Sequence, residues 1–231
     1  MRIVRGLESY PPDAPPAAVA LGVFDGIHLA HRAILATALG RARALGVEAV
    51  ACTFDPHPME ILQPDRAPLP LTTMDERLDL IARTGIGTTV VLDFTPELAA
   101  MEPEAFVKEV ILGRLNAREV IVGFNHTFGR GARGDAKLLR DLAGQLGFHA
   151  HIVPPLLVDG TPASSSAIRA ALQAGDALTV EAHLLDFTGD LYERRVRLEW
   201  VGHLREERRF DGVEALRAQI ARDVADARRR L

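Results

Sequence analysis

The chain has 231 residues, a formal net charge of −4 at pH 7 and 48% hydrophobic residues. This charge predicts no surface for nucleic acid or for an anionic membrane, and no run of about 18 apolar residues predicts a membrane span. Cys52 is the only cysteine, so no intramolecular disulfide can form, and its apolar surroundings predict a buried thiol in a reducing compartment. The N-terminal residues lack the apolar region of a signal peptide, so the expected location is the cytoplasm.

The hydrophobic pattern of the first 174 residues predicts strands that alternate with helices. Residues 1–10 can form an edge strand, and prolines predict loops at 11–16 and 59–72. The predicted strands are 19–24, 47–54, 88–94, 119–122 and 148–153. The predicted helices are 29–45, 73–83, 103–115, 136–146 and 167–174. This alternation indicates the α/β fold class with a doubly wound parallel sheet, whose ligands gather at the carboxyl ends of the strands.

The turn after strand 19–24 carries the strongest signal for a site. Asp25-Gly26 leads into a helix from Leu29, and free N–H groups at a helix start suit a phosphate. His28 and His31 share one face of that first turn and could donate hydrogen bonds to charge that develops in phosphoryl transfer. A solvated helix face remains an alternative, and a metal pair is a weaker one because no third Cys or Glu ligand is near. The chain contains neither a P-loop nor a dinucleotide fingerprint.

Three further motifs lie at strand ends or helix starts. Residues 55–58, Asp-Pro-His-Pro, form either a rigid binding loop or a stiff connection with a surface histidine. Residues 123–129 form either a ligand loop or an ordinary strand exit with Phe128 in the core. Residues 164–166 are three serines that cap helix 167–174, and Arg169 can either reach an anion with a bidentate fork or lie solvated.

These four motifs resemble those of the bacterial FAD synthetases, the adenylyltransferase modules of the bifunctional riboflavin kinase/FMN adenylyltransferase family. Residues 22–31 resemble G-x-F-D-G-x-H-x-G-H, which places the family among the H-x-G-H nucleotidyltransferases. Residues 53–58, 123–129 and 164–169 resemble T-F-[ED]-P-H-P, G-x-[DN]-[FY]-x-F-G and S-S-[TS]-x-I-R. Two positions depart from the pattern, because Ala30 replaces a glycine and His126 replaces an aromatic residue.

The resemblance implies a Rossmann-like domain in which the FMN phosphate attacks the α-phosphorus of ATP, giving FAD and pyrophosphate. It implies Mg²⁺ bound with ATP and no metal held by the protein alone. The implied catalytic residues are His28, His31, Asn125 and Arg169. The implied ATP-binding residues are Gly22, Phe24, Asp25, Gly26, His28, His31, Asn125, Ser165, Ser166 and Arg169. The implied flavin-binding residues are Pro56, His57, Pro58, Asn125 and Phe128.

The last part of the chain resembles the C-terminal end of the riboflavin kinase module, with H-L-L-D-F, D-L-Y and L-R-x-E-x-x-F. The family's general base for the riboflavin hydroxyl then falls on Glu207. The G-x-P-T-A-N segment that binds ATP and magnesium has no equivalent, so we expect a vestigial base and no kinase activity. The expected division is 1–178 and 179–231, the second part with strands 180–187 and 195–201 and helix 212–230. Such a remnant exposes strand edges and an apolar helix face, so it can also support self-association.

Two alternatives to an FMN adenylyltransferase stay open from the sequence. One is a catalytically degenerate protein that binds a flavin nucleotide or ATP, which Ala30 and the lost kinase core favour. The other is a relative with a different acceptor, such as a cytidylyltransferase or a pantetheine-phosphate adenylyltransferase. The Pro-His-Pro loop and residues 123–129 argue against that second alternative.

Overall fold

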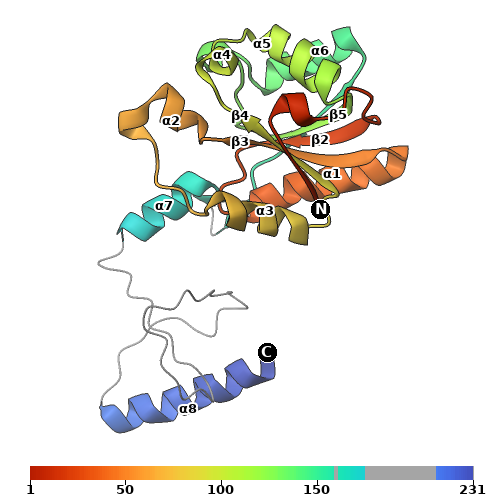
Figure 1. Ribbon diagram of the computed structural model, residues 1–231. Helices are drawn as coiled ribbons and strands as arrows, with labels where there is room; N and C mark the ends of the chain where they lie inside the picture. The colour runs from red at the N-terminus through yellow and green to blue at the C-terminus, as the bar shows by residue number, and fades with distance from the viewer. Residues whose placement is uncertain (159–160, 175–211, 231) are drawn as a thin grey trace. The chain divides into compact units, whose positions relative to one another are not determined.

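The computed structural model describes residues 1–158, 161–174 and 212–230. The chain divides into two compact units, Met1–Asp176 and Ala177–Leu231. The first unit contains a six-stranded sheet with all neighbouring strands parallel (Figure 1). In sheet order, its strands are β1 Arg2–Arg5, β4 Thr88–Asp93, β3 Glu48–Asp55, β2 Ala17–Leu21, β5 Ala117–Gly123 and β6 His149–Val153. The predicted parallel α/β sheet is therefore confirmed, and residues 2–5 do form an edge strand.

Helices cover both faces of this sheet (Figure 1). One face carries α1 Leu29–Leu45 and α3 Met74–Arg83, and the other carries α4 Pro96–Ala99, α5 Pro103–Ala105 and α6 Ala136–Leu146. Alternation along β2 divides the core, because Val19 and Leu21 belong to one buried cluster while Ala18 and Ala20 belong to the other. The central strand is thus buried on both sides, as its continuous apolar sequence predicts.

The strand order places a topological switch point beside β2. The chain runs from β2 outward through β3 to β4, and then returns to lay β5 against the other side of β2. Connections that diverge from a central strand leave a crevice at the carboxyl ends of the two strands, where open α/β sheets bind ligands. The turn after β2 and the loop after β5 both lie at this end, and both carry motifs found in the sequence.

Three elements differ from their sequence-based expectations. β2 ends at Leu21, before the predicted Phe24, because Phe24 adopts a left-handed conformation with φ of 56°. The expected loop 59–72 contains α2 Pro58–Leu62 and a 3-10 turn, η2 Pro64–Arg66. His57 accounts for α2: its Nδ1 accepts from the Met59 N–H, and its own N–H donates to Glu60. The helix from Pro103 continues as a π-helix, η3 Phe106–Arg114, in which the Leu115 N–H donates to the Val110 carbonyl.

Two 3-10 turns, η1 Leu7–Ser9 and η4 Arg130–Ala132, precede β6, and the other described elements follow it. A short hairpin, β7 Leu157–Val158 and β8 Thr161–Pro162, precedes α7 Ser165–Ala174, and α8 Val213–Arg230 belongs to the second unit. The predicted strands 180–187 and 195–201 and the predicted base Glu207 lie outside the described residues. Among the helices that the structure describes, none is long and apolar enough to cross a membrane.

Candidate active site

The turn between β2 and α1 is tightly folded and buried. Gly22 donates its N–H to the Cys52 carbonyl at 3.1 Å, which keeps the chain against β3 as it leaves the sheet. Phe24 and Ile27 are buried and have φ values of 56° and 37°, a conformation that costs free energy for residues with side chains. Such strain is maintained only where packing enforces it, and it is common at functional sites.

His28 and His31 lie together at the start of α1. His28 is the N-cap residue and makes no side-chain capping bond, and its ring stacks on that of His31 with centroids 3.7 Å apart. The rings of Phe24 and His31 form a T-shaped pair with centroids 5.4 Å apart. The Nδ1 atoms of both histidines are buried without a hydrogen-bond partner. Buried unpartnered polar atoms are costly, so two of them in one place indicate a requirement other than folding.

Burial keeps both imidazoles uncharged near neutral pH. It lowers the pKa of His31 to about 3, with a smaller contribution from His28, and it also lowers the pKa of His28. A neutral imidazole carries one N–H donor and one acceptor nitrogen. The pair can therefore donate hydrogen bonds to phosphate oxygens without carrying a permanent positive charge.

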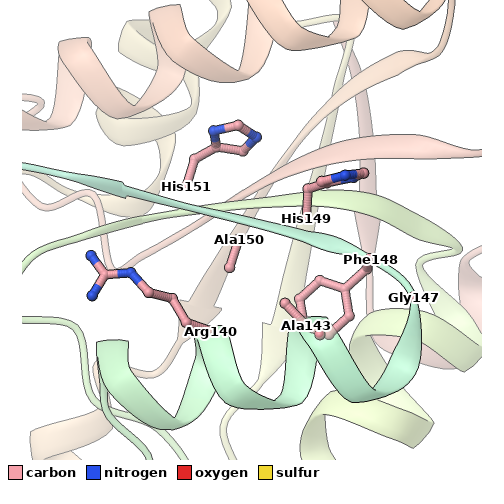
Figure 2. Close-up of a pocket in the computed structure, with 8 residues that line it drawn as sticks. Arg140, Ala143, Gly147, Phe148, His149, Ala150 and His151 are labelled. Atoms are coloured by element: carbon pink, nitrogen blue, oxygen red, sulfur yellow. The ribbon is translucent and has the colours of Figure 1, made fainter.

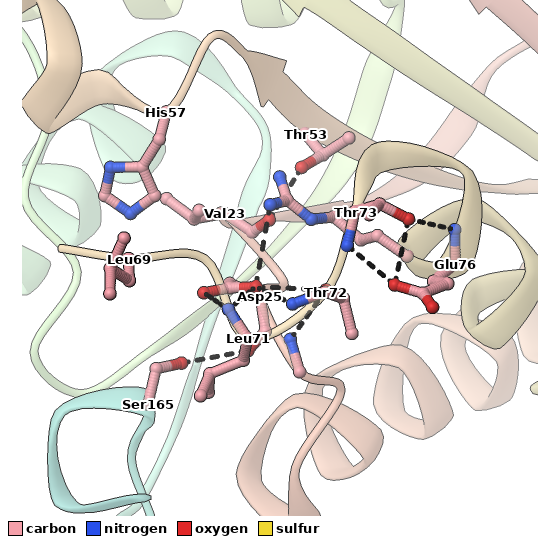
Figure 3. Close-up of polar contacts among 12 residues, drawn as sticks. Val23, Asp25, Thr53, His57, Leu69, Leu71, Thr72, Thr73, Glu76 and Ser165 are labelled. Carbon is pink, nitrogen blue, oxygen red and sulfur yellow. Dashed lines mark hydrogen bonds and ion pairs between the residues drawn. The ribbon is translucent and has the colours of Figure 1, made fainter. Parts of the chain in front are cut away.

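Asp25 joins this turn to segments far along the chain (Figure 3). The residue is 1% exposed, and its carboxylate accepts from the Leu71 and Thr72 N–H groups at 2.9–3.0 Å and from the Thr72 hydroxyl at 3.0 Å. Its backbone carbonyl accepts from Ser165 Oγ at 2.9 Å, and the neighbouring Gly26 N–H donates to Thr72 Oγ1 at 3.2 Å. Burial opposes ionisation of Asp25, but these hydrogen bonds outweigh it and lower the pKa of the carboxyl group.

Two arginines neutralise the Asp25 carboxylate. Arg77, from α3, places Nη2 3.6 Å from Oδ1, and Arg169, from α7, donates Nη2 to Oδ2. Arg169 also donates Nε to the Leu69 carbonyl at 2.7 Å. The resemblance assigned Asp25 and Arg169 to ATP, whereas in this structure both side chains bond to protein groups.

The three serines before Arg169 have distinct surroundings. Ser164 accepts from the Ala167 N–H and so caps α7, which confirms the predicted serine cap, although the helix begins at Ser165 and not at the predicted Ala167. Ser165 is bonded to Asp25, as described above, while Ser166 is exposed. Of the two serines assigned to ATP, Ser166 therefore has the side chain that is open to a ligand.

The Pro56-His57-Pro58 loop follows β3 at the same end of the sheet. His57 caps α2. Its pKa is lowered mainly by burial and further by the positive charge of Arg169, while the negative charge of Asp25 opposes this shift. His57 is thus within electrostatic reach of the Asp25 cluster, and the Thr53 hydroxyl just before the loop donates to the Val23 carbonyl at 2.8 Å. The structure brings this loop and the histidine turn together, as the sequence motifs predicted.

The loop after β5 is divided between the surface and the core. Asn125 is exposed, and its side chain folds back toward Gly123: a Cβ atom at Gly123 would lie 3.5 Å from the Asn125 Oδ1 atom. The Phe128 ring is 8% exposed, packs against Phe106 and lies over Gly134, so this side chain belongs to the core and not to the open surface. His126 stacks on Phe128; its Nε2 is buried without a partner, and burial lowers its pKa to about 4.

No motif or periodicity in the sequence indicates the residues that hold the turn in place: Arg77, Leu71 and Thr72. Arg77 is 4% exposed, and a basic residue in the amphipathic helix 73–83 gives no local sign of burial. Leu71 and Thr72 act mainly through backbone N–H groups. Only the approach of α3 and loop 69–72 to Asp25 reveals these contacts.

A hollow of about 500 Å³ lies elsewhere, where α6 meets the edge strand β6 (Figure 2). Its lining includes Arg140, Phe148, His149 and His151, none of which belongs to the motifs above. Nearby, the buried Glu119 accepts from Arg41 and is paired with His151, which links β5 to α1 and β6. Within the described residues, no group of three His, Cys, Asp or Glu side chains is arranged to hold a metal ion.

Comparison with known proteins places the site motifs in one family. Residues 11–167 match the family model described as FAD synthetase, and residues 161–231 match that described as riboflavin kinase. A relative from Geobacillus thermodenitrificans, named "Putative bifunctional riboflavin kinase/FMN adenylyltransferase", is 42% identical over 163 residues, which cover 70% of this chain and 86% of the relative. The bifunctional riboflavin kinase/FMN adenylyltransferase of Pseudomonas fluorescens is 27% identical and covers 99% of this chain and 97% of its own length.

A solved structure supports the same fold. The crystal structure titled "Macrolide-efflux Protein from Streptococcus pneumoniae" superposes with a TM-score of 0.64 and 28% identity, over 74% of this chain and 56% of that chain. The FAD synthetase match spans more than half of the present chain and contains the histidine turn, the Pro-His-Pro loop and the loop after β5. This chain belongs to the FAD synthetase family.

Proposed function

We propose that this protein transfers AMP from ATP to FMN, giving FAD and pyrophosphate, and that it does not phosphorylate riboflavin. The observation that carries the first part is the stacked, uncharged His28/His31 pair with unpartnered Nδ1 atoms at the start of α1. It lies at the switch point between β2 and β5, inside the segment matched to the FAD synthetases.

In this proposal the protein positions two substrates and stabilises charge. The FMN phosphate attacks the α-phosphorus of ATP, the bond to the β-phosphate breaks in line, and pyrophosphate leaves, so no covalent enzyme intermediate is needed. His28 and His31 donate hydrogen bonds to phosphate oxygens as charge builds up, and the free N–H groups of α1 add their dipole. Asn125 and Ser166 hold ATP from the neighbouring loop and from α7.

Mg²⁺ would neutralise charge on the ATP phosphates. The donor set of the described site fits an ion that arrives with the nucleotide, because histidines and hydroxyls surround the turn while its one carboxylate, Asp25, is already paired. We therefore assign the ion's ligands to phosphate and water, and to no residue of the described chain.

On the flavin side we propose that the ring lies along Pro56-His57-Pro58 and Asn125. Two prolines keep this loop rigid, and the half-buried His57 offers a polar edge. Phe128 is a poorer candidate for stacking than its motif suggested, because its ring is buried against Phe106. Phe124, which is 45% exposed at the end of β5, is the accessible aromatic ring in the described part of this loop.

The loss of kinase activity is proposed from the sequence. The alignment to the Pseudomonas fluorescens protein spans 303 positions, more than the 231 residues of this chain, so that relative contains residues that this chain lacks. The G-x-P-T-A-N segment, which binds ATP in the family, is absent from this sequence. Even if Glu207 can act as a base on riboflavin, no site then holds the ATP that would donate the phosphate. Self-association through residues 179–231 and a cytoplasmic location stay predictions; sedimentation of the purified protein tests the former.

The test is to incubate purified protein with Mg-ATP and either FMN or riboflavin, and to follow FAD, FMN and pyrophosphate. We expect equal amounts of FAD and pyrophosphate from FMN and no product from riboflavin. Absence of FAD formation would overturn the first proposal, and FMN formed from riboflavin would overturn the second. Replacement of ATP by cytidine triphosphate tests a different donor, and competition of pantetheine phosphate with FMN tests a different acceptor.

A second candidate function is nucleotide binding without turnover. It is favoured by Ala30 in place of the motif glycine and by Arg169, which in this structure is bonded to Asp25 and Leu69. Under this alternative, calorimetry shows saturable ATP or FMN binding with no pyrophosphate. Ala30→Gly then restores FAD formation if the alanine methyl group is the obstacle.

A further inference from the structure

The buried contacts of Arg77 suggest a role beyond packing. Its side chain is 4% exposed, yet its guanidinium makes only weak contacts: Nη1 lies 3.5 Å from the Phe54 carbonyl, Nη2 lies 3.6 Å from Asp25, and Nε has no partner. A buried cation usually makes several good hydrogen bonds, because its desolvation is expensive. Arg77 therefore has N–H donors beside the Asp25 carboxylate that make no strong hydrogen bond in this structure.

Arg169 pairs with the other oxygen of the same carboxylate and is the more exposed of the two arginines. Its side chain is 13% exposed, three times the value for Arg77, and it extends from α7, the helix that also carries the exposed Ser166. If Arg169 moves away, Asp25 still accepts from Leu71 and Thr72 and is still neutralised by Arg77. Without Arg77, in contrast, Arg169 would be the one remaining cation on a buried carboxylate within the described contacts.

We propose that Arg77 is a positioning residue for the ATP site, which retains Asp25 while the Arg169 guanidinium moves from Asp25 to an ATP phosphate. This inference rests on the proposed function, and it reconciles the motif's assignment of Arg169 to ATP with the Asp25–Arg169 pair in the structure. Arg77 itself does not touch the nucleotide; it makes Arg169 available by sharing the carboxylate.

The first test compares Arg77→Met with Arg83→Met, a matched change of an exposed arginine on the same helix. In Arg77→Met the Asp25 carboxylate holds Arg169, so we expect KM for ATP to rise at least tenfold while KM for FMN stays within twofold. Arg83→Met should leave both constants unchanged. Arg77→Lys, which keeps the charge but loses the fork, should give an intermediate rise and covers the case in which Arg77→Met does not fold.

A double-mutant cycle separates positioning from general structural damage. If Arg77 acts through Arg169, Arg77→Met adds no further loss of ATP binding to Arg169→Met. Replacing Asp25 as well, in Asp25→Asn/Arg77→Met, frees Arg169 from the carboxylate and should recover most of the lost affinity. Additive losses, or a double variant that stays as weak as Arg77→Met, would overturn the inference.

Binding is measured with the Mg²⁺ complex of α,β-methylene-ATP, which cannot release pyrophosphate, alongside the FAD assay. If the wild-type protein makes FAD and Arg77→Met binds this analogue normally, the positioning role is wrong and the proposed function survives. If the wild-type protein binds the analogue and makes no FAD, the proposed function fails while the cycle still decides the role of Arg77. If the wild-type protein neither binds the analogue nor makes FAD, both proposals are overturned.

Discussion

At the scale of single residues, the site depends on groups that the fold keeps in an unfavourable state. His28 and His31 are desolvated without partners for Nδ1, and Phe24 and Ile27 carry left-handed backbone conformations. Free energy lost in this way is offset by burial of the surrounding apolar side chains. The gain is a pair of uncharged donors that need little reorganisation when a phosphate binds.

The first prediction at this scale concerns the charge of His31. Its pKa is lowered from 6.5 to about 3 by burial and by the neighbouring His28. The unfolded chain therefore binds a proton near pH 6.5 that the folded chain binds only near pH 3, so this residue lowers stability as pH falls through that interval. Titration of the imidazole resonances by NMR, assigned with His31→Gln, should show no His31 transition above pH 5. A midpoint above pH 5 would contradict the predicted burial.

The second prediction concerns catalysis by His28. His28→Ala removes one donor to the transition-state phosphate, which is worth about 2–4 kcal/mol in comparable sites, so we expect kcat for FAD formation to fall by more than tenfold. His149→Ala is the matched control, because that side chain is 77% exposed and lies at the opposite end of the sheet's edge strand. Thermal unfolding should be similar for the two variants. An unchanged kcat in His28→Ala would remove this residue from the mechanism.

At the scale of elements, the loop after β5 is anchored by a glycine. Gly129 has φ of 70°, and a Cβ there would lie 2.7 Å from the backbone of Pro103 at the start of α5. A side chain at Gly129 would therefore push the loop and the start of α5 apart. The close approach explains why the motif ends in glycine at this position.

Gly129→Ala should therefore destabilise the protein more than Gly131→Ala. Gly131 has a similar φ of 63° and no atom within 4 Å of a built Cβ, so its substitution costs only the left-handed strain, about 1–2 kcal/mol. Gly129→Ala adds a backbone collision to that strain. Urea denaturation of both variants measures the difference, and equal free energies of unfolding would show that the loop relaxes freely.

Glu119 joins three elements at the other end of the sheet. Burial raises the pKa of this fully buried carboxyl group, but the hydrogen bonds from Arg41 and His151 outweigh it and leave the pKa below its usual value. A lowered carboxyl pKa contributes stability above pH 4.5, and this stability is lost as pH falls through the folded-state pKa.

Glu119→Gln should lower the free energy of unfolding at pH 7 by about 1.5–3 kcal/mol, the value typical of a hydrogen bond to a charged group, because the Arg41 side chain left without this partner is 38% exposed. It should also make the stability less dependent on pH below 4.5. Denaturation curves from pH 3 to 7 measure both effects. A variant that loses stability in parallel with the wild-type protein over this range would show that Glu119 does not determine the pH dependence.

At the scale of the whole molecule, the structure describes the first unit almost completely and the second only in part. The first unit contains the sheet and the four motifs, and its family match extends over residues 11–167. The riboflavin kinase match covers residues 161–231 and so includes the whole second unit, of which the described part contains only α8. The proposed function accordingly assigns chemistry to the first unit alone.

This assignment predicts that FMN must be supplied to the protein. Incubation of the whole chain with riboflavin and Mg-ATP should yield neither FMN nor FAD, and addition of a separate riboflavin kinase should restore FAD. Glu207→Gln should have no effect on FAD formation from FMN, because the proposed site does not use Glu207. Any FMN formed by the chain alone would show that the kinase site is intact.

The sequence alone was sufficient for the fold class, and it placed the motifs of the proposed site at one end of the sheet. Apolar runs that alternate with amphipathic helices require a parallel sheet covered on both faces, and the structure confirms this. Turn residues at the ends of 17–21 and 117–123 place the motifs at one edge of that sheet. These features are local and periodic, so the sequence shows them directly.

Only the tertiary structure decided how the site is held together. Asp25, Arg77 and Arg169 come from a turn and two helices separated by as many as 144 residues, and no periodicity relates them. The same holds for Phe128, whose burial depends on Phe106 and Gly134. Charges and rings find partners according to distance in space, and that distance exists only after α3, α7 and the loop after β5 have packed against the sheet.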